Sequence, residues 1–187
     1  MASGIPVRHD RVGPWEARGF KLVNDLPDAA HPAVWPVMQF GALASAPVSG
    51  GVALLAGRRA LAVKLVTAGV SAWAAAKVVK RVRVRGRPAR LLPGVTVRGT
   101  ETTGGGFVSG HAAVATALAA AAAPGVGASM RRTLWLLAPA VGASRVYVGA
   151  HLPLDTLGGA SLGLAVEAVT SAVLAAVIRR RGGRARA

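Results

Sequence analysis

The sequence of 187 residues contains no cysteine, which excludes disulfides, thiolate chemistry and cysteine-ligated metals. Aromatic residues make up only 4% of the chain, and 7 Asp and Glu residues stand against 23 Lys and Arg residues. The N-terminal residues predict no cleavable signal peptide, because they carry Arg8, Asp10 and Arg11 and lack an apolar core. Insertion into a membrane would therefore depend on the spanning helices themselves.

The hydrophobic residues that are present account for 52% of the chain, and the mean hydropathy is +0.46. Long windows carry almost no charge, which is typical of an integral membrane protein. Most of the apolar residues are Ala, Val, Leu and Gly, and helices of small residues pack closely in lipid. The length predicts a single domain built as one helical bundle.

The formal net charge of +16 raises the possibility of a nucleic-acid partner. That function would require a basic face on a soluble domain, whereas here the basic residues cluster at the ends of apolar runs. Lysine and arginine in such places anchor helices and contact anionic lipid head groups. The charge pattern therefore favours membrane lipids as partners and no nucleic acid.

The chain divides into an N-terminal segment over 1–30, a membrane-embedded region over 31–178 and a basic tail over 179–187. Residues 14–26 have the pattern of an interfacial amphipathic helix, with a solvated lead-in as the alternative. Uncharged or nearly uncharged runs predict spans over 33–56, 60–79, 109–123, 133–148 and 153–178. The predicted fold class is thus an all-α membrane bundle of about five transmembrane helices behind an N-terminal amphipathic helix.

The stretch SRVYVGAHLPLD, residues 144–155, places Arg145, His151 and Asp155 between two apolar runs. Ionisable groups at membrane depth are costly and usually mark a site. His151 and Asp155 are four residues apart, and Pro153 suits the first turn of a helix. The carboxylate could therefore orient the imidazole and leave its second nitrogen free as a nucleophile or base. The alternative is a capped turn that contains a satisfied His–Asp pair.

Two further segments contain groups that suit a phosphate. Lys80, Arg87 and Pro88 lie in an arginine-dense loop over 80–108, and Ser109-Gly110-His111 opens a helix after a run of glycines. A helix N-terminus offers free N–H groups and positive dipole character to an anion. With five spans, the 80–108 loop and the His151 turn lie on the same side of the membrane. We therefore expect one site that combines all three segments.

These three segments together resemble the type-2 phosphatidic acid phosphatase family, which shares its fold with the vanadium haloperoxidases. The family pattern is K-x6-RP, then PSGH, then SR-x5-H-x3-D. The motifs cover about residues 77–155, and the helical pattern extends the resemblance over roughly 31–178. Two departures stand out: Val108 replaces the proline of PSGH, and membrane members of the family commonly have six spans rather than five.

The resemblance implies a lipid phosphatase that acts without a metal or other cofactor. His151 would attack phosphorus and form a phosphohistidine, Asp155 would hold its tautomer, and His111 would protonate the leaving oxygen. The phosphoryl oxygens would be bound by Lys80, Arg87, Ser109, Gly110 and Arg145. Candidate substrates are phosphatidic acid, phosphatidylglycerophosphate and polyprenyl phosphates or pyrophosphates.

Two other functions fit the same fold, namely a catalytically silent lipid-binding protein and a vanadate-dependent haloperoxidase. The family resemblance places the protein in the cell membrane with its site on the extracytoplasmic face, and the positive-inside rule agrees for the remaining basic loops. Glu167 lies about 18 Å along its helix from Asp155 at 1.5 Å per residue. We expect it to have a structural role, either paired with Lys64 or protonated.

Overall fold

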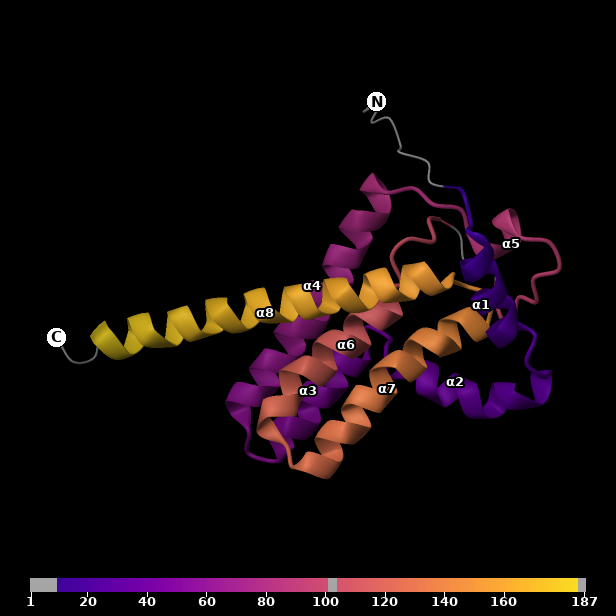
Figure 1. Ribbon diagram of the computed structural model, residues 1–187. Coiled ribbons are helices and arrows are strands. Elements are labelled where there is room, and N and C mark those ends of the chain that lie inside the picture. Colours follow the sequence, from indigo (N-terminus) through magenta and orange to yellow (C-terminus); the bar gives the residue numbers. More distant parts are fainter. Residues whose placement is uncertain (1–9, 101–103, 185–187) are drawn as a thin grey trace.

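The computed structural model describes residues 10–100 and 104–184, and every regular element within those ranges is helical (Figure 1). The element order is α1 (Pro14–Asn24), η1 (Asp28–Ala30), α2 (His31–Gln39), α3 (Ser45–Leu55), α4 (Arg59–Val82), α5 (Pro88–Leu91), α6 (Gly110–Ala122), η2 (Ala123–Gly125), α7 (Ala128–Tyr147) and α8 (Pro153–Arg184). The predicted all-helical class and the predicted helix at residues 14–26 are confirmed.

The run predicted as one span over 33–56, with kinks at its prolines, is divided into two helices, α2 and α3. The interruption is thus a full break between helices and not a kink within one helix. Residues 40–44 between them form successive tight turns. Pro36 lies inside α2 and supplies no N–H to the helix ladder. At the turn itself, a Cβ on Gly41 would come within 2.5 Å of the His111 carbonyl oxygen. The turn between α2 and α3 therefore packs against the start of α6.

Within the described residues, two helices are long and apolar enough to cross a bilayer, α4 and the 153–180 part of α8. Helix α3 is apolar but only 11 residues long, and α6 has 13 residues. A helix needs about 20 residues to cross the hydrocarbon core without a break. Membrane association thus agrees with the lengths of α4 and α8, while the number of five spans stays a prediction.

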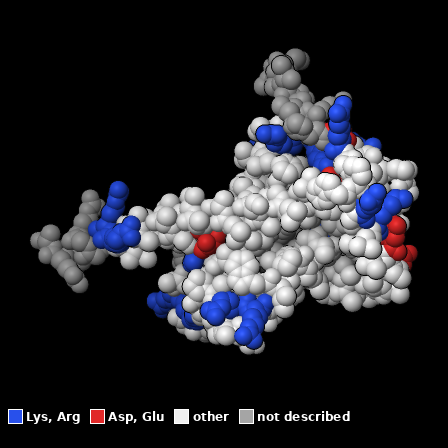
Figure 2. Space-filling view, viewed as in Figure 1, with Lys and Arg blue, Asp and Glu red and all other residues white. Residues whose placement is uncertain are grey.

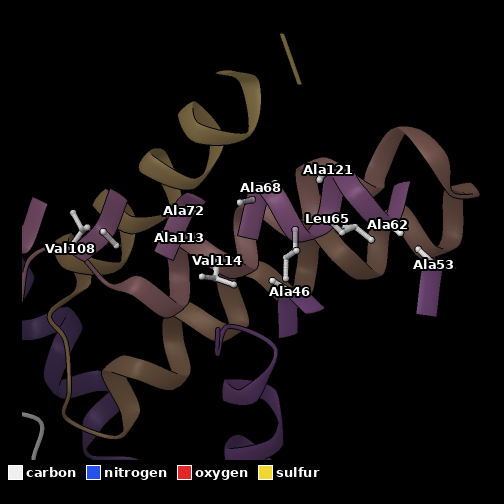
Figure 3. Packing of buried hydrophobic residues seen from close by; sticks show 13 residues of the cluster. Ala46, Ala53, Ala62, Leu65, Ala68, Ala72, Val108, Ala113, Val114 and Ala121 are labelled. Atoms are coloured by element: carbon white, nitrogen blue, oxygen red, sulfur yellow. The ribbon is translucent and has the colours of Figure 1, made fainter. Parts of the chain in front are cut away.

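The core is made mainly of alanine, with a few larger side chains such as Leu65 and Val114 between α3, α4 and α6 (Figure 3). Small side chains let the helix backbones approach closely, so van der Waals contact between them is extensive. Helix α8 packs on α6 through two glycines that lie four residues apart, Gly159 and Gly163. A Cβ at Gly159 would collide with the Ser109 carbonyl oxygen, and one at Gly163 with that of Ala113.

The helix ends define two sides of the bundle. The C-terminal half of α8 extends well past the other helices (Figure 1), and lysine and arginine gather near helix ends in the space-filling view (Figure 2). At one end of the bundle, Arg58 donates a hydrogen bond to the Gly125 carbonyl and joins the α3–α4 turn to the α6–α7 turn. The end of α4, the start of α6 and the α7–α8 turn lie at the opposite end.

Candidate active site

The structure brings the three predicted segments together at one end of the bundle. Lys80, in the last turn of α4, donates from Nζ to the Gly105 carbonyl oxygen at 3.1 Å. Arg87 donates from Nη1 to the Ala150 carbonyl oxygen at 2.7 Å. His111 at the start of α6 lies within electrostatic range of Lys80, Arg145 and His151. The expected convergence of these residues is therefore observed.

The turn between α7 and α8 carries His151 into the interior. The Arg145 carbonyl oxygen accepts hydrogen bonds from the N–H groups of Ala150 and His151, at 3.1 and 3.2 Å. Gly149 has φ of +72°, and a Cβ there would lie 2.5 Å from the Thr96 carbonyl oxygen, so glycine suits this position. His151 is 3% exposed as a result.

Asp155 combines helix capping with its predicted place beside the histidine. It is the third residue of α8, and its Oδ2 accepts from the Leu152 N–H at 2.9 Å, as in half of a capping box. Its Oδ1 accepts from Arg85 Nη1 at 3.0 Å. Asp155 Oδ2 lies 3.7 Å from His151 Nδ1, which is an electrostatic contact but too long for a hydrogen bond. The expected direct His–Asp hydrogen bond is therefore absent from this geometry.

Ser109 and Gly110 occupy the predicted helix N-terminus. Ser109 is the N-cap of α6, and its Oγ accepts from the Ala112 N–H at 3.4 Å. Its own N–H donates to the Asp155 carbonyl oxygen at 2.8 Å, which ties the start of α6 to the start of α8. Val108, at the position of the family's proline, is buried in the apolar cluster. The hydroxyl proton of Ser109 remains available for an acceptor.

Three buried side-chain nitrogens have no hydrogen-bond partner among the residues that the structure describes: Arg87 Nε, Arg145 Nε and His151 Nδ1. Buried polar groups are almost always hydrogen-bonded, so each exception calls for an explanation. All three atoms belong to predicted site residues, and two are cationic donors suited to phosphate oxygens. The Nε–H groups of Arg87 and Arg145 can thus donate hydrogen bonds to a bound anion.

The protonation of His151 follows from its surroundings. Burial is the main factor that lowers its pKa, from 6.5 to about 4, and the Lys80 and Arg145 charges act in the same direction. Asp155 opposes them and favours the imidazolium. Burial likewise lowers the pKa of Arg87, which stays charged at neutral pH. The imidazole is therefore neutral at pH 7, as a nucleophile must be.

Arg87 and Arg145 line a cavity of about 290 Å³ that also involves α2. His31, Trp35 and Met38 supply its wall on that side, and residues 97–100 and 148–150 supply another. Met38 Sδ lies 2.7 Å from Arg145 Nη1. The contribution of α2 was not foreseen from the sequence, where these residues lie in an apolar run without a motif.

Two buried charged residues at the site were also not foreseen, Glu16 of α1 and Arg85 of the loop after α4. Glu16 is 1% exposed and Arg85 is 6% exposed. Glu16 shares a face of α1 with Phe20 and Asn24, which are also buried. This four-residue spacing was the available signal for Glu16, whereas Arg85 is one of several arginines in its loop and nothing in the sequence distinguishes it.

The predicted partnership of Lys64 and Glu167 is present outside the site. Lys64 Nζ lies 2.8 Å from Glu167 Oε1, and Ser171 Oγ donates to the same oxygen at 2.6 Å. The pair joins α4 to α8. Its position agrees with a structural role.

The chain is similar to a known family in sequence and to solved structures in fold. The family model described as the PAP2 superfamily matches residues 59–179. The crystal structure of LpxE from Aquifex aeolicus aligns with a TM-score of 0.75 and 22% identity, over 84% of this chain and 95% of that one. A transmembrane PAP2-type phosphatidylglycerolphosphate phosphatase from Bacillus subtilis aligns with a TM-score of 0.66 and 21% identity, over 85% and 84%. No curated protein matches the chain by sequence.

Proposed function

Because the chain belongs to the PAP2 superfamily, we propose that it is a membrane phosphatase that hydrolyses a phosphomonoester or pyrophosphate of a lipid. The observation that carries this proposal is that Arg87 and Arg145 line one cavity, and that each has an unpartnered Nε among the described residues. Arg145 also lies within electrostatic range of the buried, neutral His151. Two cationic donors and a neutral imidazole are groups that suit phosphoryl transfer. A position at one end of the bundle suits a substrate with a membrane-embedded tail and an exposed head group.

In the proposed first step, His151 attacks phosphorus through the ring nitrogen that does not face Asp155. A nitrogen–phosphorus bond forms as the bond to the leaving oxygen breaks. His111 donates its proton to that oxygen, and the bound phosphate favours the protonated His111 by its negative charge. Lys80, Arg87 and Arg145 stabilise the charge on the equatorial oxygens, with the Ser109 hydroxyl and the Gly110 N–H as further donors.

In the second step, water attacks the phosphohistidine. His111 accepts a proton from the water, the nitrogen–phosphorus bond breaks, and inorganic phosphate leaves. His151 returns to its neutral form with Asp155 beside it. The three cations supply the electrostatic stabilisation, so the proposed mechanism needs no metal ion or other cofactor. We place the site on the extracytoplasmic face of the cell membrane, by analogy with the family.

The test is phosphate release by detergent-purified protein, with His151→Ala beside it and EDTA present. The substrates are phosphatidic acid, phosphatidylglycerophosphate, and polyprenyl mono- and pyrophosphates. We expect release from at least one lipid by the wild type and none above background by the variant. Full activity in folded His151→Ala would rule out the mechanism. Silence of the folded wild type on every substrate would favour a catalytically silent lipid-binding protein.

A further inference from the structure

A continuous chain of buried charges joins the N-terminal helix to the candidate catalytic carboxylate. Glu16 accepts two hydrogen bonds from Arg85, Nη1 to Oε1 at 3.0 Å and Nη2 to Oε2 at 2.6 Å. Arg85 Nη1 also donates to Asp155 Oδ1 at 3.0 Å. We propose that Glu16 and Arg85 are positioning residues that orient the Asp155 carboxylate toward His151. This inference rests on the proposed function of the site.

The three charged side chains are all buried, so each charge depends on the others for its stabilisation. The side chains are 1% exposed for Glu16, 8% for Arg85 and 0% for Asp155. Burial alone would lower the pKa of Arg85, but its hydrogen bonds and charge contacts with Glu16 and Asp155 raise it. Two carboxylates and one guanidinium leave a net charge of −1 beside His151. Glu16 thus neutralises Arg85, and Asp155 retains its effect on the imidazole.

Arg85 also limits the orientations open to Asp155. With Oδ1 bound to Arg85 and Oδ2 bound to the Leu152 N–H, the carboxylate is held at both oxygens. Its second oxygen then faces His151 Nδ1. Lys80 and Arg87 are within electrostatic range of the same carboxylate. Without Arg85, Asp155 would be free to turn toward these phosphate-binding cations and to compete with the substrate for them.

Glu16 in turn holds Arg85 and the start of α8. Its Oε1 accepts from the Leu154 N–H at 3.1 Å, so one carboxylate fastens both the guanidinium and the first turn that carries Asp155. Only a planar fork of donors can bridge two carboxylates in this way, which a lysine cannot reproduce. Glu16 lies outside the residues 59–179 that match the family model. The protein therefore completes its site with a residue from its N-terminal helix, outside the matched region.

The experiment compares Glu16→Gln, Arg85→Gln and the double variant with the wild type. Positioning partners of this kind typically alter activity by 10- to 100-fold. We expect kcat of each single variant to fall by about that factor, with KM changed less than about threefold. Because the two residues act through one contact, kcat of the double variant should be no lower than that of the less active single variant. Inhibition by orthovanadate, which mimics five-coordinate phosphorus, should weaken in parallel, while inhibition by inorganic phosphate should not. Folded single variants with kcat within twofold of wild type would overturn the proposal.

A reciprocal exchange separates positioning from simple docking of α1. The double variant Glu16→Arg, Arg85→Glu retains an ion pair between the helix and the loop but places a carboxylate against Asp155. We expect folded protein, judged by thermal unfolding, with kcat still reduced. Recovery of wild-type kcat would show that only the ion pair matters and would overturn the proposal. Arg85→Lys keeps the positive charge and disturbs folding less than the exchange, and it should also reduce kcat. Wild-type kcat in that variant would contradict the need for a guanidinium that bridges the two carboxylates.

The matched control is Glu167→Gln, which removes the Lys64–Glu167 ion pair of 2.8 Å. That pair also joins distant parts of the chain, α4 and α8, but it lies outside the site and involves neither Asp155 nor His151. Its kcat should equal that of the wild type. If the wild type itself neither releases phosphate nor binds vanadate, the proposed function fails and this inference with it, whereas an active wild type with unaffected variants removes only the inference.

Discussion

The Nδ1 atom of His151 lies 3.7 Å from Oδ2 of Asp155, although the two side chains are buried side by side. The carboxylate is held by other donors, the Leu152 N–H on one oxygen and Arg85 on the other. Catalytic hydrogen bonds are often long before substrate binds and shorten in the reacting complex. This pair is therefore arranged for electrostatic support of an imidazolium, with a hydrogen bond to be completed when His151 acquires positive character.

The first prediction concerns Asp155→Asn. An amide oxygen can still accept from the Leu152 N–H, but the negative charge that stabilises His151 is lost. We expect kcat to fall by roughly 10²- to 10⁴-fold, comparable with loss of the carboxylate in other His–Asp pairs. Phosphate release by the folded variant measures the effect, with Glu167→Gln, whose ion pair with Lys64 lies outside the site, as a carboxylate-to-amide control. Wild-type kcat in Asp155→Asn would contradict the assigned role.

The second prediction concerns Arg145→Lys. Lysine keeps the positive charge but removes Nε, one of the unpartnered donors, and the planar fork. Loss of one charge-assisted hydrogen bond, about 1.5–3 kcal/mol, corresponds to a decrease of about 10- to 150-fold in kcat/KM. The same substitution at Arg132, which is exposed near the start of α7, should have no effect. Equal activity of the two variants would argue against phosphate binding by Arg145.

The third prediction concerns pH. With a pKa of about 4, His151 is neutral and competent above that pH, and it loses its nucleophilic lone pair as pH falls through 4. The loss of kcat/KM that reports protonation of His151 should therefore begin only near pH 4. His111, which must be protonated to act as the acid, adds a separate change of opposite sign. Ionisation of the phosphate, with a second pKa of about 6, adds its own change. Substrates whose leaving groups differ in acidity distinguish the phosphate titration from the enzyme titrations, because only the pKa of the phosphate changes with the leaving group. An enzyme transition that stays near 6.5 would contradict the buried, cation-flanked setting of His151.

The fourth prediction concerns metals. Lys80, Arg87 and Arg145 provide three positive charges for the phosphoryl oxygens, so the proposed reaction should continue in EDTA with kcat within about twofold of the untreated value. Phosphate release after dialysis against EDTA, followed by addition of Mg²⁺, tests this. A strict requirement for Mg²⁺ would show that the cations alone do not complete the site.

The fifth prediction concerns the α6–α8 contact. A Cβ at Gly163 collides with the Ala113 carbonyl oxygen, so Gly163→Val must push the two helices apart. Overpacking of this kind typically costs about 1–3 kcal/mol. Thermal unfolding in detergent should show the loss of stability. Gly51→Ala is the control, because a Cβ at Gly51 meets nothing within 4 Å. An unchanged unfolding temperature for Gly163→Val would contradict the close backbone packing.

Local sequence patterns were enough to predict the helical class, the position of most helices and the residues of the three motifs. Apolar runs bounded by arginine and proline indicate helices directly, and helices α4, α6 and α8 begin within about one residue of the predicted positions. The spacing of His151 and Asp155 likewise indicated that the two would be neighbours. These features are local, because each depends on residues within a few turns of one another.

The other groups that complete the site are brought together by long-range packing. Glu16 and Arg85 are 69 residues apart, and Arg85 and Asp155 are 70 apart, so no helical periodicity relates them. Several arginines in the 80–108 loop carry the same charge in the sequence, and burial against two carboxylates selects Arg85. The position of the turn between α2 and α3 likewise depends on a long-range contact, the close approach of Gly41 to the start of α6. Such contacts depend on how whole helices pack, and that information is not present in any short stretch of the chain.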